Sequence, residues 1–265
     1  MEHEHLVIED GVVTGFKDGV DKASITDIEI PEGVTHIEDY AFEGCINLKS
    51  VTIPEGVTQI SAETFWECKI ESVTLPASIE AIWCDALQGC KTVTYDGTLA
   101  QWCAVDGYIE FMEEAESVVL AGEDNMDLKK VTMLEIPDGV RRIGEGAFGG
   151  CKSLERVTMS EWARVKIIGP GAFYGCTNLT RVEIPEDVTE IDNCAFQGCT
   201  SLTCVEIPED VTRIGESAFF LCESLESVSY SGMMEQWEEI EKSGWRGEDE
   251  GGLVIHCMDG DITTE

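Results

Sequence analysis

Positive charge is scarce in this chain. Its 265 residues include 53 aspartates and glutamates against 17 lysines and arginines, which gives a formal net charge of −36. Such a chain repels the phosphates of nucleic acids and of anionic membrane surfaces, so we expect neither as a partner. The acidity has two interpretations: it keeps the protein soluble and unassociated, or it attracts a basic protein partner.

Long apolar runs are also lacking. The sequence has no apolar stretch of about 18 residues, so it predicts no direct insertion into a membrane. The first residues, Met1-Glu2-His3-Glu4-His5, have neither the basic start nor the apolar stretch of a secretory signal. On these residues alone, the chain either stays inside the cell or has lost a leader.

Few residues could support catalysis. There are four histidines, and we find no nucleophile elbow, phosphate-binding loop, HExxH motif or paired-carboxylate motif. We therefore expect no enzymatic activity, no catalytic residue, no cofactor and no metal site. The acidic runs Asp259-Gly260-Asp261 and Glu248-Asp249-Glu250 lack the spacing of a calcium loop, which favours solvated charge over calcium binding.

What the chain has in abundance is repetition. Ile30-Pro31-Glu32-Gly33-Val34-Thr35 returns as Ile53-Pro54-Glu55-Gly56-Val57-Thr58, and the unit ends in a recurring cysteine. This cysteine recurs at steps of 23, 22, 61, 25, 23 and 23 residues. Such a period predicts a solenoid, in which each unit buries its apolar face against its neighbours. The seven cysteines in this phase are Cys45, Cys68, Cys90, Cys151, Cys176, Cys199 and Cys222.

Twelve cysteines would suit a disulfide framework, but their phase argues against one. Equal phase stacks seven thiols into a ladder, where small and weakly polar side chains pack well. We therefore expect free, buried, structural thiols. The other five show neither a CxxC motif nor metal-ligand spacing; they are Cys84, Cys103, Cys194, Cys204 and Cys257.

One repeat shows how the unit folds. Val51 and Ile53 alternate with polar residues, as in a short strand with one buried face, and Pro54 ends that strand. The Ala-Phe-x-Gly-Cys segment predicts a turn or a helical turn whose phenylalanine points inward. The expected fold is a β-rich α/β repeat solenoid with one short parallel strand per repeat of about 23 residues and turns or helical turns on the other face. The inward residues form a stack of Phe42, Phe65, Leu87, Phe148, Phe173, Phe196 and Phe219.

The pattern LxxVxIPxxVTxIxxxAFxGC, repeated over roughly residues 25–95 and 131–230, resembles the BspA-type leucine-rich repeat family of bacteria and protozoa. The resemblance implies a solenoid of stacked strands that serves adhesion and protein–protein contact, often on bacterial surface or secreted proteins. A cell-surface or secreted location is thus implied, whereas a native start at Met1 without a leader would make the protein cytoplasmic. Members of this family share no catalytic site that could be carried over to this chain.

The array is duplicated. Tyr95 to Trp102 matches Tyr230 to Trp237, and the second copy resembles the segment that ends arrays of this family. We interpret each copy as a short helix followed by a strand that continues the stack, with Trp102 and Trp237 as caps and the second helix running from Met233 to Lys242. We expect one curved solenoid over residues 1–265, with two hinged lobes as the alternative. Its blocks are an N-terminal segment 1–24, first repeats 25–95, an irregular insert 96–130, second repeats 131–230 and a C-terminal cap 231–265.

Function should lie on the outward face of the strands, because repeat proteins bind through extended surfaces. The outward positions form a serine and threonine track in the first half and a charged track in the second, although a solvated parallel sheet favours such ladders without any ligand. The candidate binding residues on this face are Glu135, Arg156, Thr158, Arg181, Glu183, Cys204 and Glu206. The alternative is aromatic residues that directly follow the core phenylalanine, which would contact a ligand or pack on the next turn: Trp66, Tyr174 and Phe220.

The sequence thus predicts a non-enzymatic protein-interaction or adhesion module that binds a protein partner, which the net charge favours as basic. A structural spacer or self-assembling scaffold is the alternative, and glycan binding at the aromatic positions is a weaker third. The identity of the partner and the oligomeric state stay open.

Overall fold

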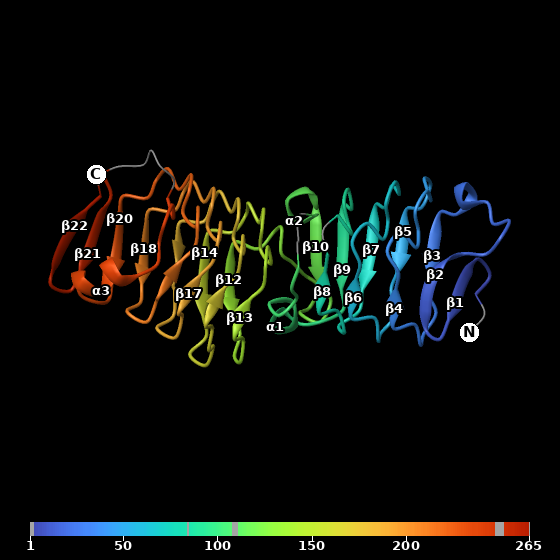
Figure 1. Ribbon diagram of the computed structural model, residues 1–265, viewed down its shortest axis with the longest axis horizontal. Coiled ribbons are helices and arrows are strands. Elements are labelled where there is room, and N and C mark those ends of the chain that lie inside the picture. Colours follow the sequence, from blue (N-terminus) through green and yellow to red (C-terminus); the bar gives the residue numbers. More distant parts are fainter. Residues whose placement is uncertain (1–2, 84, 108–110, 247–251, 265) are drawn as a thin grey trace. The chain divides into compact units, whose positions relative to one another are not determined.

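The computed structural model describes residues 3–83, 85–107, 111–246 and 252–264. By its internal contacts the chain divides into two compact units, Met1–Leu128 (unit 1) and Lys129–Glu265 (unit 2). Each unit consists of short parallel strands, one repeat apart in sequence, with few helical turns (Figure 1). This confirms the predicted repeat solenoid. The expectations for Cys84 and for the run 248–250 lie outside the described residues.

Unit 1 opens with an antiparallel hairpin and continues as a solenoid. Hairpin strands β1 (Leu6–Glu9) and β2 (Val12–Phe16) precede the 3-10 turn η1 (Lys22–Ser24), and β2 pairs in parallel with β4 (His36–Ile37). A two-stranded sheet joins β6 (Gln59–Ile60) and β8 (Ala81–Ile82). The main sheet, in the order β11-β10-β9-β7-β5-β3, consists of β3 (Asp27–Glu29), β5 (Ser50–Thr52), β7 (Ser72–Leu75), β9 (Thr92–Tyr95), β10 (Ser117–Leu120) and β11 (Met126–Asp127).

Unit 2 repeats this plan. The first strand of each repeat belongs to one of two sheets. An isolated β-bridge between Glu183 and Glu206 connects these two sheets. These sheets are β12 (Met133–Ile136), β14 (Arg156–Met159) and β16 (Arg181–Val182), and then β18 (Cys204–Ile207), β20 (Ser227–Tyr230), β21 (Val254–Cys257) and β22 (Gly260–Thr263). The second strands form the parallel sheet β13 (Arg142–Ile143), β15 (Ile167–Ile168), β17 (Glu190–Ile191) and β19 (Arg213–Ile214).

The core of each unit contains a stack of phenylalanine rings, as the sequence predicts. Consecutive ring centroids lie 5.2–5.3 Å apart in unit 2 and 5.1 Å apart in unit 1, and their planes are within 17° of parallel. Leu87 is the buried occupant of this position in the third repeat. The stacked rings are Phe42 and Phe65 in unit 1, and Phe148, Phe173, Phe196 and Phe219 in unit 2.

Rings packed edge-on end these stacks. Phe16 from β2 meets Phe42 at 5.8 Å and an interplanar angle of 80°, and Trp245 meets Phe219 at 5.7 Å and 81°. Edge-to-face packing is one of the arrangements that aromatic pairs favour. The segments that flank the arrays therefore supply an apolar contact where a further repeat would otherwise be needed.

The repeated cysteine forms hydrogen bonds to the preceding repeat. Thiols donate to the carbonyl of the core phenylalanine one repeat earlier, at distances of 3.1–3.3 Å. A small side chain with a weak donor suits this place, because it fills the space and satisfies the carbonyl. The donor–acceptor pairs are Cys68 with Phe42, Cys176 with Phe148, Cys199 with Phe173 and Cys222 with Phe196.

The described cysteines are all free, which confirms that part of the prediction. Six members of the ladder are buried, but the prediction of burial is wrong for Cys68, which is half-exposed. The following repeat is one residue shorter, and its Cys90 thiol donates to the Thr92 carbonyl of its own repeat at 3.3 Å. The ladder is therefore interrupted next to Cys68.

Both arrays end in the same way, as the matched segments predict. Helices α1 (Leu99–Trp102) and α2 (Phe111–Glu114) lead from β9 to β10, which pairs in parallel with β9, and α3 (Met234–Glu239) leads from β20 to β21, which pairs in parallel with β20. The antiparallel strands β11 and β22 then cover β10 and β21. Trp102 and Trp237 are buried 5.3 Å from the rings of Tyr95 and Tyr230, as expected of caps.

Helix α3 is shorter than predicted. It ends at Glu239 rather than at Lys242, because Ile240 has extended backbone angles (φ −62°, ψ 131°). The ammonium group of Lys242 turns back and donates to the carbonyls of Trp237 and Ile240 at 2.6 and 3.2 Å. A lysine that binds carbonyls at a helix C-terminus caps the helix instead of extending it. Burial lowers the pKa of this lysine.

The residue before the repeated cysteine has a left-handed backbone in every repeat. It is a glycine in five repeats, with φ between 61° and 78°, but Glu67 (φ 60°) and Leu221 (φ 59°) take its place in the other two. A residue with a Cβ is less stable in this region by about 1–2 kcal/mol. The glycines of the sequence motif are thus explained by backbone conformation, and the two exceptions are strained.

Candidate functional site

The outward side chains of the parallel strands in unit 2 form one row, which we name the unit 2 strand face. Alternation along each strand turns these side chains outward, while the valines between them are buried. The pairing register sets Arg156 beside Arg181 and Glu135 beside Thr158, and the bridge sets Glu183 beside Glu206. All seven residues predicted from the sequence lie on this face: Glu135, Arg156, Thr158, Arg181, Glu183, Cys204 and Glu206.

Ion pairs order the centre of this face. Glu183 accepts a hydrogen bond from Nη2 of Arg156 at 2.6 Å, and the same carboxylate oxygen lies 3.7 Å from Nε of Arg181. Arg181 also approaches Glu206, with 3.9 Å between Nη2 and Oε1. Exposed ion pairs stabilise a fold by at most about 1 kcal/mol each, so the contribution of this network to the stability of the fold is small. It does hold two guanidinium groups in fixed positions on an accessible surface.

Next to this network lies an exposed apolar side chain that the sequence reasoning missed as a binding candidate. Met133 on β12 is 67% exposed and pairs in register with Arg156 on β14. Methionine and arginine are both enriched at protein interfaces. The available signal was the outward position of Met133, which is apolar where neighbouring repeats carry polar residues.

Cys204 is the exposed thiol of the described cysteines, and its surroundings do not resemble those of a nucleophile. Its partner in register is Ser227 on β20, and His256 lies on β21, one strand further. His256 itself pairs with Asp261 at 2.9 Å. A reactive thiol needs a base or a positive group nearby. The bridge between Glu183 and Glu206 sets Arg181 in register with Cys204, but the guanidinium group of Arg181 lies beside the carboxylates of Glu183 and Glu206. The described strands place no histidine beside Cys204 that could act as its base.

The strand face of unit 1 has a different chemistry. Serines and threonines lie in register over three strands, from Ser50 and Thr52 on β5 to Thr92 and Thr94 on β9. Asp27 stands at the edge of this track, and hydrogen bonds from Ser50 and Thr26 lower the pKa of its carboxyl group. This neutral track confirms the predicted contrast between the two halves.

The three aromatic candidates do not form one described surface. Trp66 (41% exposed) belongs to unit 1, whereas Tyr174 (37% exposed) and Phe220 belong to unit 2. Gln197 occupies the same position in the repeat between Tyr174 and Phe220, and Phe220 is half-buried. The aromatic alternative therefore depends on separate residues, of which Trp66 and Tyr174 are accessible.

Other exposed aromatic side chains were missed. Tyr40, Trp83 and Trp162 are 46%, 48% and 59% exposed. Trp162 lies in the repeat that has two extra residues, and the guanidinium group of Arg164 stands 5.6 Å from its ring centroid. The longer step of 25 residues was the signal for this insertion, because insertions in repeat proteins map to surface loops.

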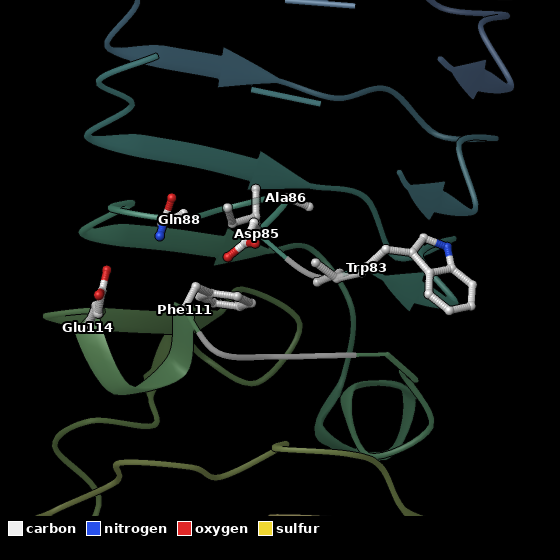
Figure 2. A pocket seen from close by; sticks show the side chains of 8 residues that line it. Trp83, Asp85, Ala86, Gln88, Phe111 and Glu114 are labelled. Carbon is white, nitrogen blue, oxygen red and sulfur yellow. The ribbon is translucent and has the colours of Figure 1, made fainter. Parts of the chain in front are cut away.

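A small hollow lies beside Trp83 in unit 1 (Figure 2). Its volume is about 40 Å³, and its lining includes Asp85, Gln88, Phe111 and Glu114. The carboxylate of Glu114 accepts a hydrogen bond from the backbone N–H of Gly89 at 3.3 Å. The Asp85 carboxylate lies over the Phe111 ring, whereas the indole of Trp83 points away from it.

Among the described residues, no group of three or more histidine, cysteine, aspartate or glutamate side chains has the arrangement of a metal site. Asp259 accepts a hydrogen bond from the backbone N–H of Met234 at 2.8 Å. In the part of the chain that the structure describes, no helix is both long and apolar enough to cross a bilayer.

Comparison with known families matches this chain to a family described as BspA type Leucine rich repeat region. Six copies match, over residues 19–96 and 125–243. These ranges contain the repeats of both units and the strands that form the unit 2 strand face. Comparison with curated protein sequences gives no match.

Several solved structures are similar to this chain. A leucine rich cell surface protein from Faecalibacterium prausnitzii has 25% sequence identity and a TM-score of 0.54, with 82% of each chain covered. The pneumococcal vaccine antigen PcpA has 13% identity and a TM-score of 0.46, with 88% of this chain and 81% of that chain covered. A leucine-rich repeat protein from Bacteroides ovatus has 16% identity and a TM-score of 0.35, with 94% and 99% covered.

Proposed function

The chain belongs to the BspA-type leucine-rich repeat family, and from this premise we propose that it is a recognition module that binds a protein partner through the unit 2 strand face. The observation that carries the proposal is the charged network on this face. Two arginines are held at an exposed surface by Glu183 and Glu206, beside the exposed Met133. Arginine is enriched in binding hot spots, and methionine and arginine are both enriched at protein interfaces.

The network suits recognition because its geometry exists before a partner binds. Each guanidinium group has five N–H donors, and the ion pairs use only some of them. The remaining donors can bind carboxylate or carbonyl oxygens of a partner, at little further cost in side-chain entropy. The acidic groups between the arginines would match basic residues of the same partner, so the face favours a partner of mixed charge.

The module is proposed to be non-enzymatic, because repeat proteins of this family are generally so and Cys204 has no base beside it on the strand face. The alternative of a self-assembling scaffold has less support. Each array ends in an antiparallel strand, β11 or β22, and such a cap interrupts the stacking that would join copies end to end.

We further propose a bacterial cell surface or the extracellular space as the location. The support is the similar protein from Faecalibacterium prausnitzii, whose name states that it is a cell surface protein. Labelling of intact cells with a membrane-impermeant amine reagent tests this. Recovery of the labelled protein supports the location, and labelling only after lysis contradicts it.

The binding proposal is tested by affinity capture from surface and host-cell extracts with three baits. The first is the wild type, the second carries Arg156→Gln and Arg181→Gln, and the third carries Arg164→Gln as a control that removes a single arginine outside the face. Glutamine is chosen because a reversal to glutamate would place new carboxylates beside Glu183 and Glu206 and lower stability by repulsion. Arg164 is an ion-paired, exposed arginine of the same unit that lies outside the strands of the face.

We expect the wild type and the Arg164 variant to capture the same partner and the double variant to lose it, while all three unfold at the same temperature. Capture should weaken as salt increases, because charges on an exposed face are screened. A double variant that retains the partner at both salt concentrations would show that the unit 2 strand face is not the binding site.

A further inference from the structure

A second surface in unit 1 is built by the turns that carry the core phenylalanines. In each of three repeats, one hydrogen bond closes the turn around the buried core residue. The backbone N–H of the residue directly after the core residue donates to the carbonyl of the residue two places before the core residue. The distances are 2.9 Å for Glu43 to Tyr40, 3.0 Å for Trp66 to Glu63 and 3.3 Å for Gln88 to Asp85. The first and fourth residues of such a turn lie close together. The residues that accept these hydrogen bonds form one row, and the residues that donate them form a second row. Together the rows form what we name the unit 1 turn surface, with Tyr40, Glu63 and Asp85 in the first row and Glu43, Trp66 and Gln88 in the second.

The first two of these turns stack directly on one another. The backbone N–H of Phe42 donates to the carbonyl of Thr64 at 3.1 Å, and that of Gly44 donates to the carbonyl of Trp66 at 3.2 Å. The Tyr40 hydroxyl is within hydrogen-bonding reach of the Glu63 carboxylate in the next repeat, and this contact raises the pKa of Tyr40. The surface is therefore continuous from the first repeat to the second.

The surface combines negative charge with exposed aromatic rings. Tyr40 is 46% exposed and Trp66 is 41% exposed, and both stand among carboxylates. The ammonium group of Lys22 donates to the backbone carbonyl of Glu43 at 2.8 Å. Among the described ion pairs, none neutralises the carboxylates of Glu43, Glu63 or Asp85.

The third turn, with Asp85 and Gln88, lines the hollow of about 40 Å³ (Figure 2). In Figure 2 Asp85 lies above the Phe111 ring, and Gln88 and Glu114 lie on the side of the hollow away from Trp83. Two carboxylates, those of Asp85 and Glu114, thus flank an apolar floor, and the Gln88 side chain stands beside them. This arrangement offers hydrogen-bond acceptors and an aromatic face to a small cationic head group.

The equivalent turns of unit 2 show that the fold does not require this chemistry. Their two rows contain no carboxylate in any of four repeats, and small or neutral residues fill most positions. The same backbone turn therefore forms without acidic side chains. The corresponding residues are Gly146, Gly171, Cys194 and Ser217 in the first row, and Gly149, Tyr174, Gln197 and Phe220 in the second.

We propose that the unit 1 turn surface binds a basic polypeptide segment of a partner protein. One lysine or arginine head group occupies the hollow between Asp85 and Glu114, above Phe111, and a second lies against Trp66 beside Glu43 and Glu63. Charge complementarity selects this occupant, because every ionisable group of the surface other than Tyr40 is a carboxylate. The aromatic rings add cation–π contacts that a surface of carboxylates alone would lack. This site is separate from the unit 2 strand face and does not depend on it.

The test is a fluorescence titration of the full chain with a short synthetic peptide of lysine, arginine and glycine, near physiological salt. One variant carries Glu63→Gln, Asp85→Asn and Glu114→Gln. Asparagine is chosen at position 85 because it tolerates the positive φ of 56° found there. The control variant removes the same charge from exposed carboxylates of unit 1 outside the surface, through Asp18→Asn, Glu32→Gln and Glu80→Gln.

We expect saturable binding to the wild type, about tenfold weaker binding to the first variant and less than about a twofold change for the control. If both variants weaken binding equally, net charge alone attracts the peptide and the proposal fails. Trp66→Gln tests the surface without touching a carboxylate and should weaken binding about threefold. An unchanged affinity of that variant would also overturn the proposal, and thermal unfolding checks that each variant is folded.

Discussion

At the residue scale, backbone conformation determines several positions that look like sequence consensus. The glycine before the repeated cysteine is needed because its φ is positive, and the cysteine is retained because its thiol satisfies a carbonyl of the preceding repeat. Neither reason can be deduced from the sequence alone, although the periodicity showed that both residues recur at fixed positions in the repeat. The two repeats that lack the glycine are therefore informative exceptions.

Replacing these exceptions by glycine should stabilise the protein. Glu67 and Leu221 are exposed and hold a left-handed backbone, so Glu67→Gly and Leu221→Gly should each raise the free energy of unfolding by up to about 1 kcal/mol. The converse change, Gly198→Ala (φ 74°), should lower it by about 1 kcal/mol. Urea unfolding measures all three, and a loss of stability in both glycine variants would refute the strain.

Thiol reactivity should follow burial. Cys204 is exposed and should react with iodoacetamide at the rate of a small free thiol, whereas buried ladder thiols should react only after unfolding. Burial raises the pKa of Cys90 to about 11 and that of Cys103 to about 12, so both should stay unreactive well above neutral pH. Mass spectrometry of the labelled peptides measures the rate at which each thiol reacts. Fast labelling of the ladder in the folded protein would contradict the structure, and a Cys204 rate far above that of a free thiol would favour an enzyme.

At the element scale, the strands and the ring stack were predictable because they repeat, and the endings were less so. Alternation over Ser50 to Ile53 was enough to place a strand, since each copy of the pattern supports the others. The C-terminal end of α3 was not predictable, because it depends on a tertiary contact. Glu241 pairs with Arg213 of β19, so the chain leaves the helix before Lys242, which caps it instead. The exposed aromatics were also missed, since Tyr40 and Trp83 occupy positions that vary between repeats.

The ring stack provides a test at this scale. Phe173 is fully buried between two parallel rings, so Phe173→Ala should lower the free energy of unfolding by about 3–5 kcal/mol. Phe173→Leu should cost much less, because Leu87 occupies the same position in the third repeat. Denaturant unfolding of both variants gives the comparison, and equal losses would mean that ring stacking rather than cavity volume dominates.

At the scale of the whole molecule, the charge is unevenly distributed between the units. All seven arginines lie in unit 2, and none lies in unit 1. The sequence indicated a charged second half, but it could not show that Glu183 holds both arginines of the strand face, because Arg156 lies 27 residues before Glu183 and meets it only through the register of the strands. The net charge argued against nucleic acids and anionic membranes as partners. The positions of the side chains in the structure were needed to locate the unit 2 strand face and the unit 1 turn surface.

The net charge of −36 should make stability depend on salt. Repulsion among carboxylates destabilises the compact state, and salt screens it over a distance of about 10 Å at 0.1 M. We therefore expect the melting temperature to rise as sodium chloride is added from low ionic strength. A melting temperature that falls over this range would mean that local ion pairs outweigh the general repulsion.

Photo-crosslinking from Cys204 tests the central claim, that the unit 2 strand face is the recognition surface, most directly. Because this thiol is exposed on the face, a maleimide benzophenone can be attached there without changing any charge. The control carries the same probe on Glu216→Cys in a Cys204→Ser background, two residues beyond β19 of the other sheet. The account predicts a covalent adduct between the captured partner and the Cys204 probe, with little or none from the control. Adducts of equal yield from both positions, or from the control alone, would contradict it.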